Sequence, residues 1–76
     1  MAKKRTFTVQ WDKGRERFTA TDENGDLLGS DRTLDLAIGS AVREANQASK
    51  AGCSVTVKVR NKSGKLKVEY VAQPLG

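Results

Sequence analysis

The hydrophobic and polar positions of this chain alternate in its first and last parts and follow a helical period in between. From Thr33 to Lys50 the apolar residues recur at intervals of three and four, which places them on one side of a helix. They are Leu34, Ala37, Ile38, Ala41, Val42, Ala45 and Ala48. Because most of these are alanines, we expect the helix axis to lie close to a sheet that supplies the bulky side chains of the core.

Before the helix, two segments alternate in the way that half-buried strands do. Their apolar positions are Phe7, Val9 and Trp11 in the first segment and Phe18 and Ala20 in the second. Gly14 lies between the segments and tolerates a positive φ, so we expect the two strands to close as a hairpin. Residues 23–26 form a further turn, and residues 27–28 are compatible with either a short extra strand or a loop under the helix.

After the helix, a second pair of segments alternates. The residues predicted to face the core are Cys53, Val55, Val57 and Val59 in the first segment and Leu66, Val68 and Tyr70 in the second. Residues 61–64 supply the turn between them. The sequence therefore predicts an α+β domain of order ββαββ, with one helix packed on one face of a four-stranded, largely antiparallel sheet. The pattern leaves the strand order open.

Both ends of the predicted helix carry local signals. Thr33 is the predicted N-cap, and Asp35 places negative charge near the positive end of the helix dipole. Gly52 is able to adopt the left-handed conformation that ends many helices. These signals agree with the boundaries of the apolar stripe.

The length and composition of the chain indicate one small domain. The sequence has 76 residues, a net charge of +5 and a single cysteine, and the lack of a cysteine pair agrees with a reducing compartment. It has no apolar run long enough to span a membrane, and no hydrophobic segment follows its basic start, as a secretory signal would require. We therefore expect a cytoplasmic protein with flexible tails at residues 1–4 and 72–76.

The residues present do not indicate catalysis. The chain has no histidine, and its carboxylates fall mostly in turns or near helix ends, where solvation or capping explains them. Cys53 lies on the apolar side of a predicted strand, which is typical of a small core residue. The glycines are too scattered for a nucleotide-binding loop. We expect a non-enzymatic protein with no cofactor, no metal site and no small-molecule substrate.

The charges are unevenly distributed. Residues 50–67 contain six basic residues and no acid, whereas residues 22–35 contain five acids opposed only by Arg32. Cations and hydroxyl groups on the sheet face away from the helix suit phosphate oxygens, so nonspecific nucleic-acid or polyanion binding is the leading functional prediction. The residues expected to make contact are Arg15, Arg17, Lys58, Arg60, Lys62, Lys65 and Lys67. The alternative is a solvated polar face that needs no ligand.

The aromatic residues bear on how such a ligand would be bound. Phe7, Trp11, Phe18 and Tyr70 all fall on the predicted core face. Sheets that stack single-stranded bases use exposed aromatic residues. We therefore expect contacts to the nucleic-acid backbone, with little selectivity for sequence.

The outer side of the helix supports a rival prediction. Leu36 points away from the apolar stripe, beside Gly39, Ser40 and Arg43. A glycine in the middle of a helix costs about 1 kcal/mol relative to alanine, so close approach of another surface would explain it. The rival is a homodimer or an adaptor that uses this side of the helix. An isolated exposed leucine beside a tolerated glycine is the simpler alternative.

Several short motifs are spread over nearly the whole chain. They are residues 18–25, the Thr33-x-x-x-Ala37-Ile38 opening of the helix, the alternating Val55 and Val57, Gly64 and Tyr70. Together they resemble a small uncharacterised bacterial family built as ββαββ, a domain of unknown function. The usual glutamate before the helix alanine is Leu36 here. The resemblance implies the topology and no activity, ligand or site residue.

Overall fold

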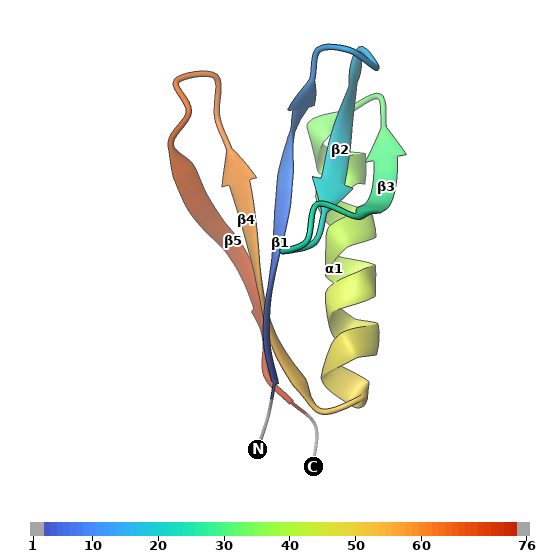
Figure 1. Ribbon diagram of the computed structural model, residues 1–76, viewed down its shortest axis with the longest axis vertical. Helices are drawn as coiled ribbons and strands as arrows, with labels where there is room; N and C mark the ends of the chain where they lie inside the picture. Colours follow the sequence, from blue (N-terminus) through green and yellow to red (C-terminus); the bar gives the residue numbers. More distant parts are fainter. Residues whose placement is uncertain (1–2, 75–76) are drawn as a thin grey trace.

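The computed structural model describes residues 3–74 as one helix lying across one face of a five-stranded sheet (Figure 1). The strands are β1 (Lys3–Asp12), β2 (Arg17–Thr21), β3 (Leu27–Asp31), β4 (Cys53–Arg60) and β5 (Leu66–Ala72), and the helix is α1 (Leu34–Lys50). The predicted α+β class and the packing of the helix on the sheet are confirmed. The predicted four-stranded ββαββ order is wrong by one strand, because the order is βββαββ.

The additional strand is β3, the segment that the sequence left undecided. Its residues do not alternate cleanly between apolar and polar, so the strand depends on its pairing with β2, where Ala20 lies opposite Gly29. A Cβ at residue 29 would lie 3.2 Å from the Cβ of Ser40 on α1. Glycine therefore lets the helix lie close against this edge strand.

The sheet order is β3-β2-β1-β4-β5, so the strands before the helix meet the C-terminal hairpin where β1 lies beside β4. β1 and β4 are parallel, whereas the other neighbouring strands are antiparallel. The parallel pair follows from the connection. β3 runs in the same direction as β1, and α1 carries the chain back to the end of the sheet where β1 begins (Figure 1).

The core lies between α1 and the central strands. Phe7, at 1% exposed, and Val9, Val55 and Val57, at 0%, are its largest fully buried side chains. The buried positions of the helix are Ala37, Ala41, Ala45 and Ser49. The helix thus contributes small side chains and the sheet contributes bulky ones, as the alanine-rich stripe predicts.

Both predicted helix ends are confirmed. Thr33 has extended backbone angles, and its Oγ1 accepts a hydrogen bond from the backbone amide of Leu36 at 3.3 Å. At the other end, Gly52 has a φ of +95°. These two residues act locally, through a side-chain oxygen and a missing Cβ, so the sequence signal was sufficient to place them.

The first hairpin turn differs from the prediction in one detail. The residue with a positive φ is Glu16, at 54°, and not Gly14. The turn occupies residues 13–16, so its left-handed residue falls immediately before β2. Asp12 stabilises the turn, because its Oδ1 accepts a hydrogen bond from the backbone amide of Arg15 at 3.2 Å.

A register shift divides β5 into two parts. Val57 lies opposite Tyr70 and Lys58 lies opposite Val68, so Glu69 is an extra residue in the ladder. Tyr70 therefore faces the helix side as predicted. Leu66 and Val68 were predicted to face the core, but the shift turns them to the other face, where they are 45% and 51% exposed.

The ends of the chain differ in part from the expected flexible tails. Lys3 and Lys4 belong to β1, and Ala72 ends β5 with only 4% of its surface exposed. Residues 1–2 and 75–76 of the predicted tails lie outside the described residues. Within residues 3–74, no helix has the length and apolarity that crossing a membrane requires.

Candidate nucleic-acid interface

The face of the sheet that α1 does not cover, called the open face below, is built mainly from hydroxyl, amide and cationic side chains. Phe7 and Val57 lie buried under the helix, so the residues that alternate with them point to the open face. These residues are Lys4, Thr6, Thr8, Gln10 and Asp12 from β1, Ser54, Thr56, Lys58 and Arg60 from β4, and Arg17, Thr19 and Thr21 from β2, of which Thr19 is only 2% exposed.

Four cations follow the long direction of the open face. Lys4 is opposite Ser54, Lys58 is opposite Thr8, Arg60 comes two residues later on β4, and Arg17 is opposite the last residue of β1. The row therefore extends from Lys4 to the level of Asp12 on β1, or roughly 26 Å at about 3.3 Å per residue step. Of the predicted contact residues, Arg17, Lys58 and Arg60 are in this row.

Three more of the predicted contact residues lie in turns at the end of the sheet where β1 and β4 finish. Lys62 and Lys65 are exposed in the β4–β5 turn. Arg15 is exposed in the β1–β2 turn, and its Nη1 is 3.3 Å from Oδ2 of Asp12. Lys62 and Lys65 therefore extend the row of cations, whereas the charge of Arg15 is balanced by its neighbour.

Lys67 was predicted to lie on the open face, and that prediction is wrong. It lies opposite Val59, so it shares the side of the sheet that faces the helix. The register shift in β5 is the cause, because one extra residue exchanges the two faces of the strand. The open face gains apolar side chains in place of this cation, namely Leu66, Val68 and Val71.

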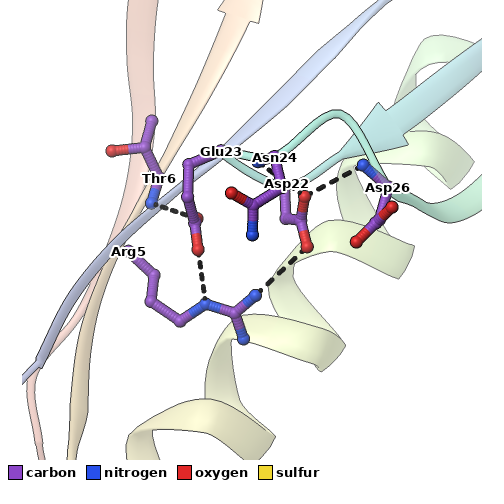
Figure 2. Close-up of polar contacts among 6 residues, drawn as sticks. All are labelled: Arg5, Thr6, Asp22, Glu23, Asn24 and Asp26. Atoms are coloured by element: carbon purple, nitrogen blue, oxygen red, sulfur yellow. Dashed lines mark hydrogen bonds and ion pairs between the residues drawn. The ribbon is translucent and has the colours of Figure 1, made fainter.

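In the β2–β3 turn, Asp22 and Glu23 direct their carboxylates toward Arg5 of β1 (Figure 2). Oε1 of Glu23 accepts a hydrogen bond from Nε of Arg5 at 3.0 Å, and Oε2 accepts one from the backbone amide of Thr6 at 3.1 Å. Asp22 adds an ion pair, with 3.3 Å between its Oδ2 and Nη2 of Arg5. Because β2 ends at Thr21, Glu23 takes the place of a strand partner for β1.

These contacts shift two pKa values. Burial acts to raise the pKa of the Glu23 carboxyl, but hydrogen bonds from its own backbone, from Arg5 and from the Thr6 amide outweigh it and lower that pKa. The hydrogen bond to Glu23 raises the pKa of Arg5. Arg5 is also 5.0 Å from the centre of the Phe7 ring. The side chain of Arg5 thus connects β1 to the β2–β3 turn, and two carboxylates balance its charge.

The outer side of α1 differs in part from the rival prediction. Leu36 is 60% exposed, Arg43 is exposed, and no atom lies within 4 Å of a Cβ built on Gly39. Ser40, however, faces β3, where its hydroxyl donates to Oδ2 of Asp31 at 3.0 Å. The structure therefore brings Leu36, Gly39 and Arg43 together on one surface without Ser40.

Trp11 is the residue whose environment was not foreseen. It lies on the helix side of β1, as predicted, but half of its surface, 50%, is exposed. The reason is its position along the strand, because the end of the β1–β2 hairpin extends past the beginning of α1 (Figure 1). The place of Trp11 two residues before the turn at residues 13–16 was the available signal in the sequence.

Trp11 lines a cleft of about 780 Å³ between the ends of β1 and β4. The parallel pairing ends at Val9 and Val59, and beyond that point the two hairpins diverge (Figure 1). The lining residues are Gln10, Trp11, Phe18, Leu34, Val59, Arg60, Asn61 and Lys62. The cleft thus combines apolar side chains with two cations, Arg60 from the row on the open face and Lys62 from the β4–β5 turn.

A search for metal sites and a comparison with known proteins give no other indication of what these surfaces bind. Among the residues that the structure describes, no group of three or more His, Cys, Asp or Glu side chains is placed to hold a metal ion. Comparison of the chain with protein-family models, curated proteins and solved structures finds no match. The resemblance drawn from short motifs stays a prediction.

Proposed function

We propose that this protein is a non-enzymatic module that binds nucleic acid through phosphate contacts on the open face, with little selectivity for base sequence. The observation that carries the proposal is the row formed by Lys4, Lys58, Arg60 and Arg17, flanked by the partly exposed threonines Thr6, Thr8 and Thr21. Cations release condensed counterions from the nucleic acid, and hydroxyl groups donate hydrogen bonds to phosphate oxygens.

The placement of the acidic residues supports the same proposal. Asp22 and Glu23 pair with Arg5 beyond the end of β2, and Asp31 accepts a hydrogen bond from Ser40 on the helix side. Asp12 lies at the end of the cation row, where Arg15 balances it. These four carboxylates are therefore held by the protein's own groups, whereas Glu16 in the β1–β2 turn and Glu69 in β5 are exposed.

The expected salt dependence follows from the number of cations. If all four cations of the row neutralise phosphates of a single strand, the slope of log affinity against log salt is about −2.8, at about 0.7 per phosphate. Raising the salt concentration from about 50 mM to about 200 mM then weakens binding roughly 50-fold. A titration at several salt concentrations measures this slope directly.

Two double variants with the same change in net charge test whether the open face is responsible. Lys58→Gln with Arg17→Gln removes half of the row, so we expect the slope to fall to about −1.4. The control, Arg32→Gln with Arg43→Gln, removes two exposed cations outside the row and should leave the slope unchanged. Equal losses in both variants would show that net charge alone drives binding and would rule out the open face.

A second candidate function is a homodimer or adaptor, and the exposure of Leu36 favours it. Leu36 is 60% exposed next to Gly39, which leaves room for close approach of another chain. In this case the sedimentation mass should rise with protein concentration, and Leu36→Asp should return it to the monomer value. A monomer mass at every concentration would eliminate the homodimer.

A further inference from the structure

We propose that the cleft between the ends of β1 and β4 holds one unpaired nucleobase of a single strand bound on the open face. This inference rests on the proposed function and adds a preference for single strands. It departs from the sequence-based expectation, which placed all four aromatic residues in the core and left no platform for stacking.

The first support is the geometry of Trp11. Its ring meets the ring of Phe18 edge to face, with 5.0 Å between the ring centres and 72° between the planes. This contact fixes one side of the indole, while 50% of the residue remains exposed. An exposed aromatic ring held in place is the platform on which proteins stack unpaired bases, because every base offers a flat π surface.

The second support is the shape and composition of the cleft. Leu34 and Val59 continue the apolar floor beside Trp11 and Phe18. The volume of about 780 Å³ is within the range of about 300–1,000 Å³ that small-molecule sites occupy. Because β1 and β4 no longer pair past Val9 and Val59, their diverging edges also offer backbone groups to the polar rim of a base.

The third support is electrostatic, because the charge of the cleft favours a ligand that carries phosphate. Arg60 and Lys62 line the cleft, and no carboxylate belongs to its lining as far as residues 3–74 show. Nη1 of Arg60 donates to the backbone oxygen of Gly64 at 3.0 Å, which holds the guanidinium at the β4–β5 hairpin. Arg60 also belongs to the cation row, so the same side chain borders both the cleft and the path of the phosphates.

A double helix would not satisfy this arrangement. Its bases are stacked and paired, so none reaches the cleft unless it is first flipped out, which costs a few kcal/mol. A single strand offers unpaired bases at no such cost. The chemistry of the cleft therefore selects single strands, while the open face alone would accept either form.

The direct experiment uses the intrinsic fluorescence of Trp11, the only tryptophan in the chain. A short oligothymidylate is compared with an abasic oligonucleotide of equal length and charge and with a duplex of equal length. We expect the oligothymidylate to quench or shift the tryptophan emission and to bind roughly 5- to 150-fold more tightly than the abasic strand. The abasic strand should leave the emission almost unchanged.

The outcomes separate this inference from the proposed function. Equal affinities for the oligothymidylate and the abasic strand, with no change in emission, would overturn the base-binding cleft and leave phosphate binding intact. A lack of binding to all three nucleic acids would overturn both. Tighter binding to the duplex than to the single strand would overturn the inference alone.

Variants at Trp11 provide a second readout, measured by the anisotropy of a labelled oligothymidylate. Trp11→Ala should lower the affinity for oligothymidylate to that for the abasic strand, whereas Trp11→Phe should retain most of the difference. Gln47→Ala shortens an exposed side chain of α1 that does not line the cleft, and it should change neither affinity. Should Trp11→Ala not fold, the comparison of probes in the unmodified protein still decides the question.

Discussion

Replacing Gly39 by alanine should stabilise the protein, and the structure sets the size of the gain. Gly39 is exposed in the middle of α1, and no atom lies within 4 Å of the Cβ that alanine would add. The new methyl group therefore creates no clash and buries almost nothing. What remains is the difference in helix propensity, which favours alanine by about 0.8–1 kcal/mol.

This free energy converts into a change in melting temperature. With about 2.1 cal/mol/K of unfolding entropy per residue, a chain of 76 residues has roughly 160 cal/mol/K. A gain of about 0.8–1 kcal/mol then raises Tm by about 5–6 °C. Thermal unfolding followed by far-ultraviolet circular dichroism measures this shift, and urea unfolding should show a higher midpoint with an unchanged slope.

Gly29 is the matched control, because the same substitution meets a different environment. A Cβ at residue 29 would lie 3.2 Å from the Cβ of Ser40, whose hydroxyl is held by Asp31. Ser40 is thus poorly able to move aside, and we expect Gly29→Ala to destabilise the fold by about 1 kcal/mol or more. The two glycine variants should shift Tm in opposite directions.

A drop in Tm for Gly39→Ala would refute this reasoning. The simplest cause would be another chain packed closely against Gly39, as in the homodimer on the Leu36 side of α1. The effect of Gly39→Ala would then depend on protein concentration. A rise in Tm that is independent of concentration would support an unoccupied outer helix surface.

Three further predictions concern single side chains. Phe7→Ala removes the largest fully buried side chain and should cost about 3–5 kcal/mol, enough to leave a domain of this size partly or wholly unfolded in circular dichroism. Thr33→Ala removes the cap acceptor for the Leu36 amide and should cost about 1 kcal/mol in urea unfolding, whereas Thr33→Ser should restore most of it. The pKa of Glu23 is lower in the folded state than in the unfolded state, so its ionised form stabilises the fold above the unfolded value near pH 4.5. That stability is lost as the pH falls through the folded pKa, and Glu23→Gln should remove this part of the pH dependence. Because Glu23 is partly exposed, with 35% of its side chain accessible, its contribution to the free energy of unfolding should stay below about 1 kcal/mol. An identical pH dependence of stability in the unmodified protein and in Glu23→Gln would contradict the role given to Glu23.

The sequence by itself determined the features that depend on neighbouring residues. Helix α1, its cap at Thr33 and its end at Gly52 follow from a local period, a side-chain acceptor and a missing Cβ. The burial of Phe7 and Val57 follows from alternation along single strands. Each of these signals acts within a few residues, so it is legible without knowledge of the partner element.

Only the tertiary structure decided the features that depend on which strands meet and in what register. β3 forms because it pairs with β2 and because Gly29 lets the helix lie close to it. Ser40 faces inward because α1 approaches β3 at Gly29. One extra residue in β5 moved Lys67 off the open face, since pairing with β4 sets the register there. Trp11 is exposed because the hairpins diverge past the point where α1 begins. Such placements arise from contacts between residues far apart in the chain, and no local period records them.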